Sequence, residues 1–148
     1  MIEIVELSAV DTHSLRHSVL RTGTVSDDVV FDGDEDATTF HLGVTVHGEL
    51  VAVSTWRHQA CAHHPSRRAY RLRGMATLPA RRASGFGGRL LDAGADRCRS
   101  TGAELVWARA RVSALEFYVH RGFEPIGVDY VDEATGLPHR DIVLELIG

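Results

Sequence analysis

Strict alternation of apolar and polar residues marks the first strands of the chain. Every second residue from 40 to 46 is apolar, a His47-Gly48 pair follows, and apolar residues resume over 50–53. Alternation with this period is typical of half-buried strands, and a short turn containing glycine joins two of them as a hairpin. The apolar residues within 2–5 begin an earlier strand. The pattern therefore predicts a hairpin preceded by a strand.

Residues 69–78 predict a further strand, because charged and apolar residues alternate there too. Alternation through the whole segment assigns its side chains to two faces: Leu72, Gly74 and Ala76 on one, and Arg71, Arg73, Met75 and Thr77 on the other. The remaining strands are predicted by apolar runs at 105–107, 123–131 and 142–146, with a turn at Gly136-Leu137-Pro138 before the last.

Helical periodicity separates these strands. Ser8 and Asp11 have the spacing of a capping box, which predicts a helix that carries Leu15 and Val19 and ends near Gly23. Two further helices are predicted: one from Gly85 to about Gly102 with a stripe of Leu90, Leu91, Ala95 and Cys98, and one over Ser113–His120. The element order βα, ββ, βαβα, ββ predicts an α/β protein with a mixed sheet flanked by helices. At 148 residues, without linker or repeat, one domain over residues 1–148 is expected.

Composition narrows the function classes. A net charge of −4 and a pI near 6.1 leave no general field that would gather nucleic acid. The N-terminus has neither a basic start nor a long apolar stretch, so no signal peptide or membrane span is predicted. Two cysteines without CxxC spacing fit a reducing compartment. We expect a cytoplasmic protein that binds neither nucleic acid nor a membrane.

The glycine-rich turn between the strand at 69–78 and the next helix carries the clearest chemistry. Such a turn exposes backbone N–H groups at the positive end of a helix, which suits a phosphate, and Arg81 and Arg82 stand beside it. A dinucleotide fingerprint needs GxGxxG, which is absent here. A Walker A loop needs a Lys-Ser/Thr pair where this chain has Gly88-Arg89.

Two motifs carry a family resemblance. Arg82-x-x-Gly85-x-Gly87 between a strand and a helix resembles motif A of the GNAT acyltransferases, which holds the pyrophosphate of acetyl-CoA. The helix Ala114-x-x-Phe117-Tyr118, closed by a Gly-Phe turn, is similar to a later motif of that family. Three further pieces resemble the ElaA-like branch of the superfamily: 32–36 leading into His41-Leu42, Leu72-Arg73-Gly74-Met75-Ala76, and Gly136-Leu137-Pro138-His139.

The resemblance implies a mixed, largely antiparallel sheet with two helices on each side or nearly so. It implies direct acetyl transfer from acetyl-CoA to a primary amine of a small molecule or peptide. The residues it assigns to coenzyme A (CoA) are Met75, Ala76, Thr77, Arg81, Arg82, Ala83, Ser84, Gly85, Phe86, Gly87, Gly88, Arg109, Ser113 and Phe117. At Arg109 relatives often have asparagine. Tyr118 matches the family's usual proton donor to the departing thiolate.

The general base is left open by the sequence. Some relatives carry a carboxylate or histidine before the glycine turn, but this chain has Arg71 and Arg73 there, and arginine stays protonated. We favour His41 or His139 as the base, with Glu35 as a third candidate.

The same two arginines are candidates to bind a carboxylate or phosphate on the acceptor. The alternative is an exposed strand face paired to acidic residues. The acidic loop with Glu35 is instead placed to attract a cationic amine.

Other interpretations remain. The group His58, Cys61, His63 and His64 has metal-ligand residue types but no second ligand cluster, so no metal is expected. The aspartates of 32–36 lack the glycine and glutamate of a calcium loop. A catalytically weak acyl-CoA-binding or sensing module is the main alternative to an enzyme. The oligomeric state, including a homodimer, stays open.

Overall fold

The computed structural model describes residues 1–146. Its strands are β1 (Ile2–Leu7), β2 (Phe40–Val46), β3 (Glu49–His58), β4 (Ala69–Thr77), β5 (Leu105–Arg111), β6 (Glu124–Val131) and β7 (Pro138–Glu145). Its α-helices are α1 (His13–Leu15), α2 (Phe86–Ser100) and α3 (Leu115–His120). A 3₁₀ turn at Val10–Thr12 and a π turn at Arg16–Leu20 extend α1 on both sides, and 3₁₀ turns at Pro79–Arg81 and Val112–Ala114 precede α2 and α3.

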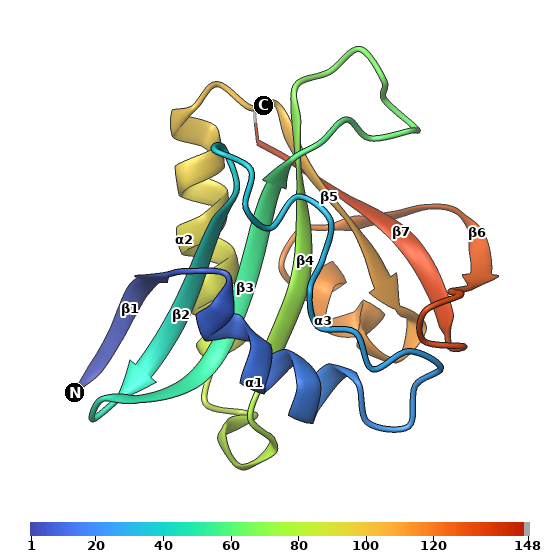
Figure 1. Cartoon of the computed structure of the whole chain (residues 1–148). Coiled ribbons are helices and arrows are strands. Elements are labelled where there is room, and N and C mark those ends of the chain that lie inside the picture. The colour runs from blue at the N-terminus through green and yellow to red at the C-terminus, as the bar shows by residue number, and fades with distance from the viewer. Residues whose placement is uncertain (147–148) are drawn as a thin grey trace.

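The strands form one seven-stranded sheet in the order β1-β2-β3-β4-β5-β7-β6. Only β4 and β5 run parallel, so the mixed, mostly antiparallel sheet that the resemblance implies is confirmed. Their pairing covers only Ala69–Arg71 against Leu105–Trp107. Beyond these residues the two strands diverge, and Figure 1 shows β6 and β7 turned away from β1–β4. This divergence opens the middle of the sheet.

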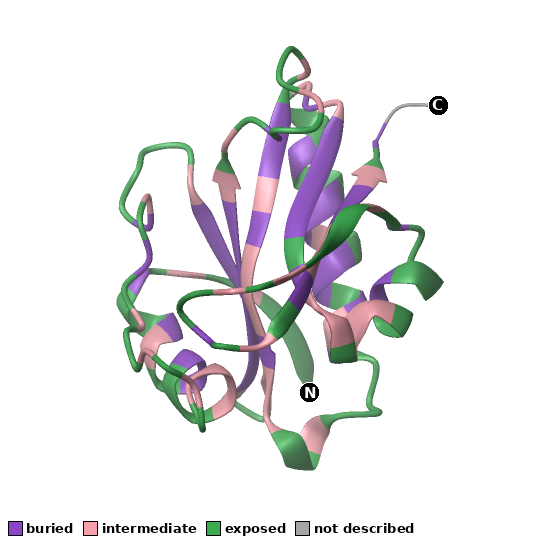
Figure 2. Cartoon of the chain, turned by 90° about the vertical axis from the view of Figure 1, so that its right-hand side faces the viewer, coloured by how far each residue is buried: buried purple, intermediate pink, exposed green. Residues whose placement is uncertain are grey.

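Helices cover both faces of the sheet (Figure 1). The apolar stripe of α2 packs on one face, where Leu90 and Cys98 join Trp56 in the main core, and Tyr118 of α3 belongs to the same core. The helical segment 10–20 covers the other face, which we call the α1 face, with Leu15 against Val53. Figure 2 shows buried residues running along the central strands between these layers. The α1 face therefore carries one helical segment rather than two, because residues 21–39 form turns and coil.

The hairpin between β2 and β3 is confirmed, with its turn at His47 and Gly48 in the left-handed region. Strict alternation in β4 is wrong. Leu72 faces the α2 side, whereas Ala76 joins Leu15 and Val53 on the α1 face. The register slips between Val53 and Thr55 of the neighbouring strand, opposite Gly74, whose φ is +59°. A β-bulge of this kind adds one residue to a strand and exchanges the faces beyond it.

A buried ion pair fixes the helical segment to the sheet. Arg16 donates from Nη1 to Asp34 Oδ2 at 2.7 Å and from Nη2 to Asp34 Oδ1 at 3.0 Å. The same guanidinium donates to Thr55 Oγ1 on β3 and to the carbonyl of Val29. Asp34 also accepts the backbone N–H of Phe31. One arginine thus joins the helix, the following coil and the sheet.

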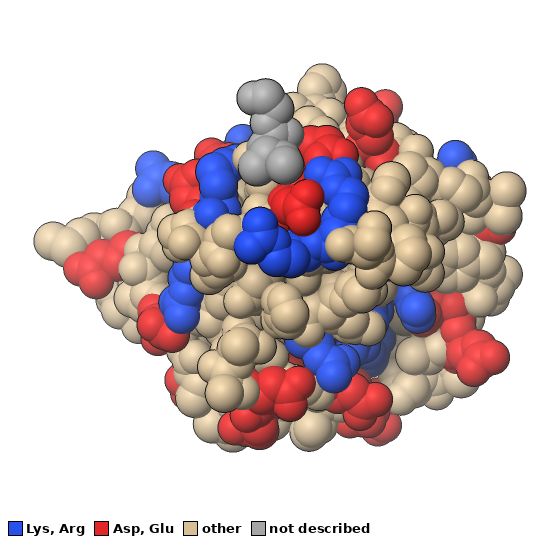
Figure 3. Space-filling view, turned by 90° about the horizontal axis from the view of Figure 1, so that it is seen from above, with Lys and Arg blue, Asp and Glu red and all other residues tan. Residues whose placement is uncertain are grey.

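Charged side chains of both signs are interspersed on the face shown in Figure 3, which fits exposed ion pairs such as Arg67–Glu145 and Arg68–Glu104. No helix within residues 1–146 is long and apolar enough to cross a membrane.

Candidate active site

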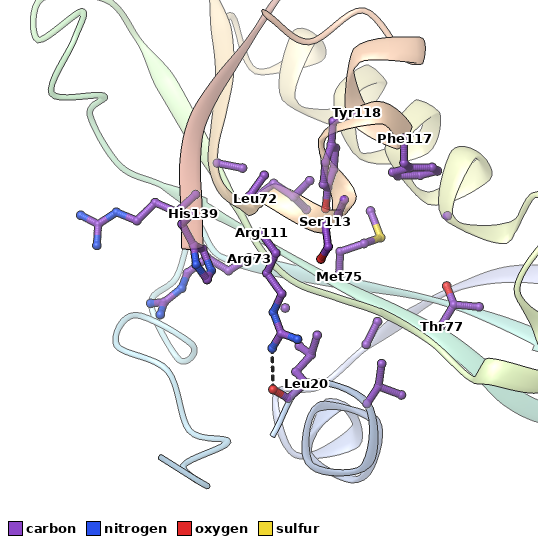
Figure 4. Close-up of a pocket in the computed structure, with 18 of the residues that line it drawn as sticks. Leu20, Leu72, Arg73, Met75, Thr77, Arg111, Ser113, Phe117, Tyr118 and His139 are labelled. Carbon is purple, nitrogen blue, oxygen red and sulfur yellow. Dashed lines mark hydrogen bonds between the residues drawn. The ribbon is translucent and has the colours of Figure 1, made fainter. Parts of the chain in front are cut away.

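A cleft of about 850 Å³ opens where β4 and β5 diverge. Its walls are β4 and β5, the glycine turn with the start of α2, α3, the end of the helical segment 10–20, and residues of the loop before β7. Figure 4 shows two sides of it, with Tyr118 and Phe117 on one and His139, Arg73 and Arg111 on the other. The cleft therefore joins residues from most of the chain.

The glycine turn forms one end of the cleft. Ala83 and Gly85 both have positive φ, +70° and +79°, which turns successive backbone groups of the loop in new directions. Arg89 N–H donates to Gly85 O as the first full α-helical bond of α2. Phe86 and Gly87 line the cleft, and their N–H groups lie in the first turn of α2, where backbone donors have no helical acceptor and suit an anion.

Close packing explains the next two glycines. A Cβ on Gly87 would lie 3.0 Å from the Phe117 ring, and one on Gly88 would lie 2.3 Å from the Arg121 guanidinium. Arg121 therefore reaches the N-terminus of α2, where a phosphate would add a favourable charge contact. Of the predicted turn residues, Arg81, Arg82, Ala83, Gly85, Phe86 and Gly87 line the cleft, and Ser84 and Gly88 do not. Arg121 was not among the predicted site residues, although it stands directly before the Gly-Phe turn.

Tyr118 lines the cleft from α3. Its ring packs edge-on against Phe117 and Phe123, with centroids 5.1 and 5.4 Å away. Figure 4 shows Tyr118 and Met75 pointing into the same region. Burial raises the pKa of Tyr118 to about 12. The phenol is therefore protonated at neutral pH and can donate a proton within the cleft.

The two candidate histidines have different surroundings. His41 does not line the cleft, and both its ring nitrogens are engaged, Nδ1 with Thr55 Oγ1 at 2.8 Å and Nε2 with Asp34 O at 3.0 Å. His139 lines the cleft, and its Nδ1 lies 2.9 Å from Leu137 O. A carbonyl only accepts, so Nδ1 of His139 carries a hydrogen, and in the neutral imidazole Nε2 then keeps a lone pair. The structure thus brings His139 to the cleft and leaves His41 in a structural network.

Of the three residues predicted to bind the acceptor, two line the cleft and one does not. Arg71 and Arg73 line the cleft on the α1 face, where Arg71 lies over Trp107 and Arg73 over Phe31. Glu35 is exposed and does not line the cleft. Its neighbours Asp34 and Asp36 form ion pairs with Arg16 and Arg57, so these two charges of the acidic loop are compensated within the protein.

Strand register places Arg109 with the acceptor residues. It lies two residues after Trp107 along β5, so the two share the face opposite the buried Ala108 and Ala110, which contact the α2-side core. Met75, Ala76, Thr77, Ser113 and Phe117 also line the cleft, as the CoA assignment expects. Arg109 lines the cleft as well, near Arg71, and its assignment to CoA stays a prediction.

Arg111, which the sequence offers beside Arg109 as a candidate phosphate contact, also lines the cleft. It follows Arg109 on β5, opposite His139 of β7, and donates from Nη2 to Leu20 O at 2.6 Å (Figure 4). Burial lowers its pKa, with the nearby Arg21 adding to the effect. This bond links β5 to the end of the helical segment and bounds the cleft on the α1 face. Only the folded register could have revealed it.

Neither cysteine is arranged as a nucleophile. Cys61 and Cys98 are buried and outside the cleft, and burial raises the pKa of Cys98 to about 12, so its thiolate is scarce. Within residues 1–146 no three His, Cys, Asp or Glu side chains are placed to share a metal ion, and His63 instead contacts Asp141 at 3.1 Å.

A glycine turn at a helix N-terminus, beside two parallel strands that diverge, is typical of an acyltransferase fold and site. The chain matches the family model described as "Acetyltransferase (GNAT) domain" over residues 37–125. It belongs to the GNAT acetyltransferase family.

Relatives support the same assignment. The chain is 31% identical over 127 residues to YitI of Bacillus subtilis (strain 168), described as an uncharacterized N-acetyltransferase, covering 86% of this chain and 85% of that protein. Its structure is similar to that of Escherichia coli ElaA, with a TM-score of 0.79, 19% identity and coverage of 98% and 100%. It is also similar to an aminoglycoside 6'-N-acetyltransferase solved with coenzyme A, with a TM-score of 0.75, 13% identity and coverage of 99% and 98%. These two structures share the fold.

Proposed function

We propose that the protein transfers an acetyl group from acetyl-CoA directly to a primary amine of a small molecule or peptide. The observation that carries this proposal is the single cleft that joins the glycine turn, the protonated Tyr118 and His139. An anion site, a proton donor and a proton acceptor are what amine acetylation by a thioester requires.

The residues present fit coenzyme A. The turn at Ala83 and Gly85, the first N–H groups of α2, and the guanidinium groups of Arg82 and Arg121 form a cationic cradle for a pyrophosphate. Past Arg71 the edge of β4 has no pairing with β5. Its free backbone groups near Met75–Thr77 can therefore pair with the amides of the pantetheine arm. When bound, acetyl-CoA supplies an activated acyl group.

The chain's own groups then handle charge and protons. A backbone N–H of the exposed β4 edge stabilises the negative charge that develops on the thioester oxygen. His139 Nε2 takes a proton from the incoming ammonium group, directly or through water, because only a neutral amine attacks. Tyr118 gives its phenolic proton to the departing thiolate sulfur, and its raised pKa ensures that the hydroxyl carries that proton at neutral pH.

Calorimetry with acetyl-CoA and a CoA-release assay over a panel of amines test this proposal. We expect acetyl-CoA to bind to the wild-type protein and thiol release to depend on an added amine. The chain contains no lysine, so self-acetylation of lysine cannot mimic turnover. Tight binding without turnover on any amine would favour the sensing module, and absence of binding would overturn both.

A further inference from the structure

Three arginines line the α1 face of the cleft without a carboxylate partner. Arg71 and Arg73 come from β4 and Arg109 from β5. Among residues 1–146, none of these guanidinium groups lies within an ion pair. Like charges gathered at a cleft destabilise the empty site, so a group that neutralises them is expected there.

Arg71 differs from the other two arginines whose Nε atom is buried. Three Nε atoms are buried without a hydrogen bond among the described residues, those of Arg16, Arg57 and Arg71. Asp34 holds the guanidinium of Arg16, and Asp36 lies 3.5 Å from Arg57. Arg71 has no such carboxylate. Because nearly all buried polar groups in folded proteins are satisfied, this orphaned donor indicates a missing anionic partner.

Aromatic rings hold these guanidinium groups in place. Arg73 lies 4.5 Å from the Phe31 centroid, and Arg71 and Arg109 lie 5.0 and 6.0 Å from Trp107. Such contacts orient a cation without removing its charge. Burial, together with the charges of Arg73 and Arg109, lowers the pKa of Arg71 to about 9. The charge is therefore incompletely compensated inside the protein.

The carboxylates that face the cluster are already engaged. Asp34, which acts on Arg73 over a longer distance, accepts both hydrogen bonds from Arg16. Asp132, which faces Arg109 and His139, accepts the Thr135 N–H at 3.0 Å. Asp141, which lies opposite Arg109 in the β5–β7 register, accepts the Tyr130 hydroxyl and contacts His63 at 3.1 Å. None of these groups replaces a ligand oxyanion between the three arginines.

We propose that Arg71, Arg73 and Arg109 bind a carboxylate or phosphate group of the acceptor. The acceptor is then a small amine that carries an anionic group, and its amine reaches toward His139 on the same face of the sheet. His139 lies opposite Arg111 in the β5–β7 register, and Arg111 is two residues after Arg109 on the same face of β5. The anion site and the base therefore share one wall of the cleft. This inference rests on the proposed acetyl transfer.

Matched acceptors of similar length test the substrate class. The CoA-release assay is run with γ-aminobutyrate, aminopropylphosphonate, butylamine and putrescine at saturating acetyl-CoA. We expect kcat/KM for one or both anionic amines to exceed that for butylamine by about 100-fold, because charge-assisted hydrogen bonds form only with an oxyanion. The carboxylate and phosphonate arms show which oxyanion fits. Equal turnover of butylamine, or preference for putrescine, would overturn the inference and leave acetyl transfer intact.

Substitutions locate the effect. Arg71→Met and Arg73→Met should each raise KM for the preferred anionic amine by about 10- to 100-fold while KM for acetyl-CoA and for butylamine stays within about twofold. Arg97→Met is the matched control, because Arg97 also lies over an aromatic ring, Phe40, but outside the cleft. Equal rises in the KM values for the anionic amine and for acetyl-CoA would contradict the assignment.

A binding measurement decides the case in which no amine of the panel reacts. Protein saturated with CoA, so that the pyrophosphate site is filled, is titrated with inorganic phosphate and with succinate by calorimetry. Binding that Arg71→Met abolishes and Arg97→Met preserves supports the anion site even if the transfer reaction proves wrong. Absence of anion binding, or binding that Arg71→Met leaves unchanged, would overturn the inference.

Discussion

At the scale of single residues, Tyr118 gives the sharpest prediction. Tyr118→Phe removes only the hydroxyl and keeps the ring contacts with Phe117 and Phe123. We expect kcat to fall by about 100-fold or more, which is typical of losing a general acid, while the calorimetric affinity for acetyl-CoA is unchanged.

The pH profile provides the control. The pKa of about 12 keeps the phenol protonated, so the loss in Tyr118→Phe should be the same from pH 6 to pH 9. Wild-type turnover by the variant would remove Tyr118 from the mechanism.

The two histidines can be separated by substitution. His139→Gln keeps a side chain that can donate to Leu137 O but removes the free ring nitrogen, so we expect kcat to fall by about 100-fold at neutral pH. His41→Gln disturbs hydrogen bonds to Thr55 and Asp34, so it should lower the melting temperature while changing kcat little. Steady-state kinetics and thermal melts of both variants check this. The reverse pattern would assign the base to His41.

At the scale of elements, α2 depends on a glycine in its buried stripe. A Cβ on Gly94 would lie 1.9 Å from the ring of Trp56, which is fully buried, donates to Ser54 Oγ and stacks on Phe40. Alanine favours helices over glycine by about 1 kcal/mol, but the overlap should outweigh it. We expect Gly94→Ala to lower the free energy of unfolding by about 1–3 kcal/mol.

Urea unfolding checks the packing of α2, with Asp92→Ala on the exposed side of the helix as control. Asp92→Ala should change stability by less than about 0.5 kcal/mol. A Gly94→Ala variant as stable as the wild type would show that Trp56 moves aside.

The sequence predicted those elements whose signal is local. The stripe of α2 and the His47-Gly48 hairpin follow from spacing alone. The Ser8–Asp11 capping box forms only in part: Ser8 N–H donates to Asp11 Oδ2 at 3.1 Å, but the N-cap of the first turn is Ala9, without a side-chain hydrogen bond. The β4 bulge at Gly74 could not be read in this way, because a bulge depends on the neighbouring strand. An isolated alternating pattern gives no sign of where its register slips.

The residues of the candidate site also fall into two groups, those that a local motif predicts and those that only the fold brings to the cleft. The glycine turn and Tyr118 lie in contiguous motifs, so the sequence alone placed them. Arg121 and Arg111 reach the cleft through contacts with Gly88 and Leu20, far away in the chain. The difference between His41 and His139 likewise depends on which atoms surround each ring. Side chains that act through long-range contacts required the structure.

At the scale of the whole molecule, the Arg16–Asp34 pair should govern acid stability. Burial by itself raises the pKa of Asp34, but hydrogen bonds from Arg16 and Phe31 N–H and the Arg16 charge hold it below the ordinary 3.8. A lowered carboxyl pKa contributes stability that is complete above the unfolded-state pKa and is lost as pH falls through the folded-state pKa. The helical segment 10–20, the coil after it and β3 should therefore loosen together below about pH 4.

Asp34→Asn tests this coupling because it removes the carboxylate and leaves Arg16 buried without a counter-charge. At pH 7 the free energy of unfolding should fall by about 3–5 kcal/mol. The difference from the wild type should begin to shrink below about pH 4, where Asp34 of the unfolded chain becomes protonated, and should be lost as the pH falls through the lower folded-state pKa. Asp36→Asn is the matched control, since its pair with Arg57 is largely exposed and should contribute less than about 1 kcal/mol. Urea unfolding of the three proteins between pH 3 and pH 7 measures both effects. A deficit in Asp34→Asn that does not change with pH would show that the loss comes from packing rather than from the charge of Asp34.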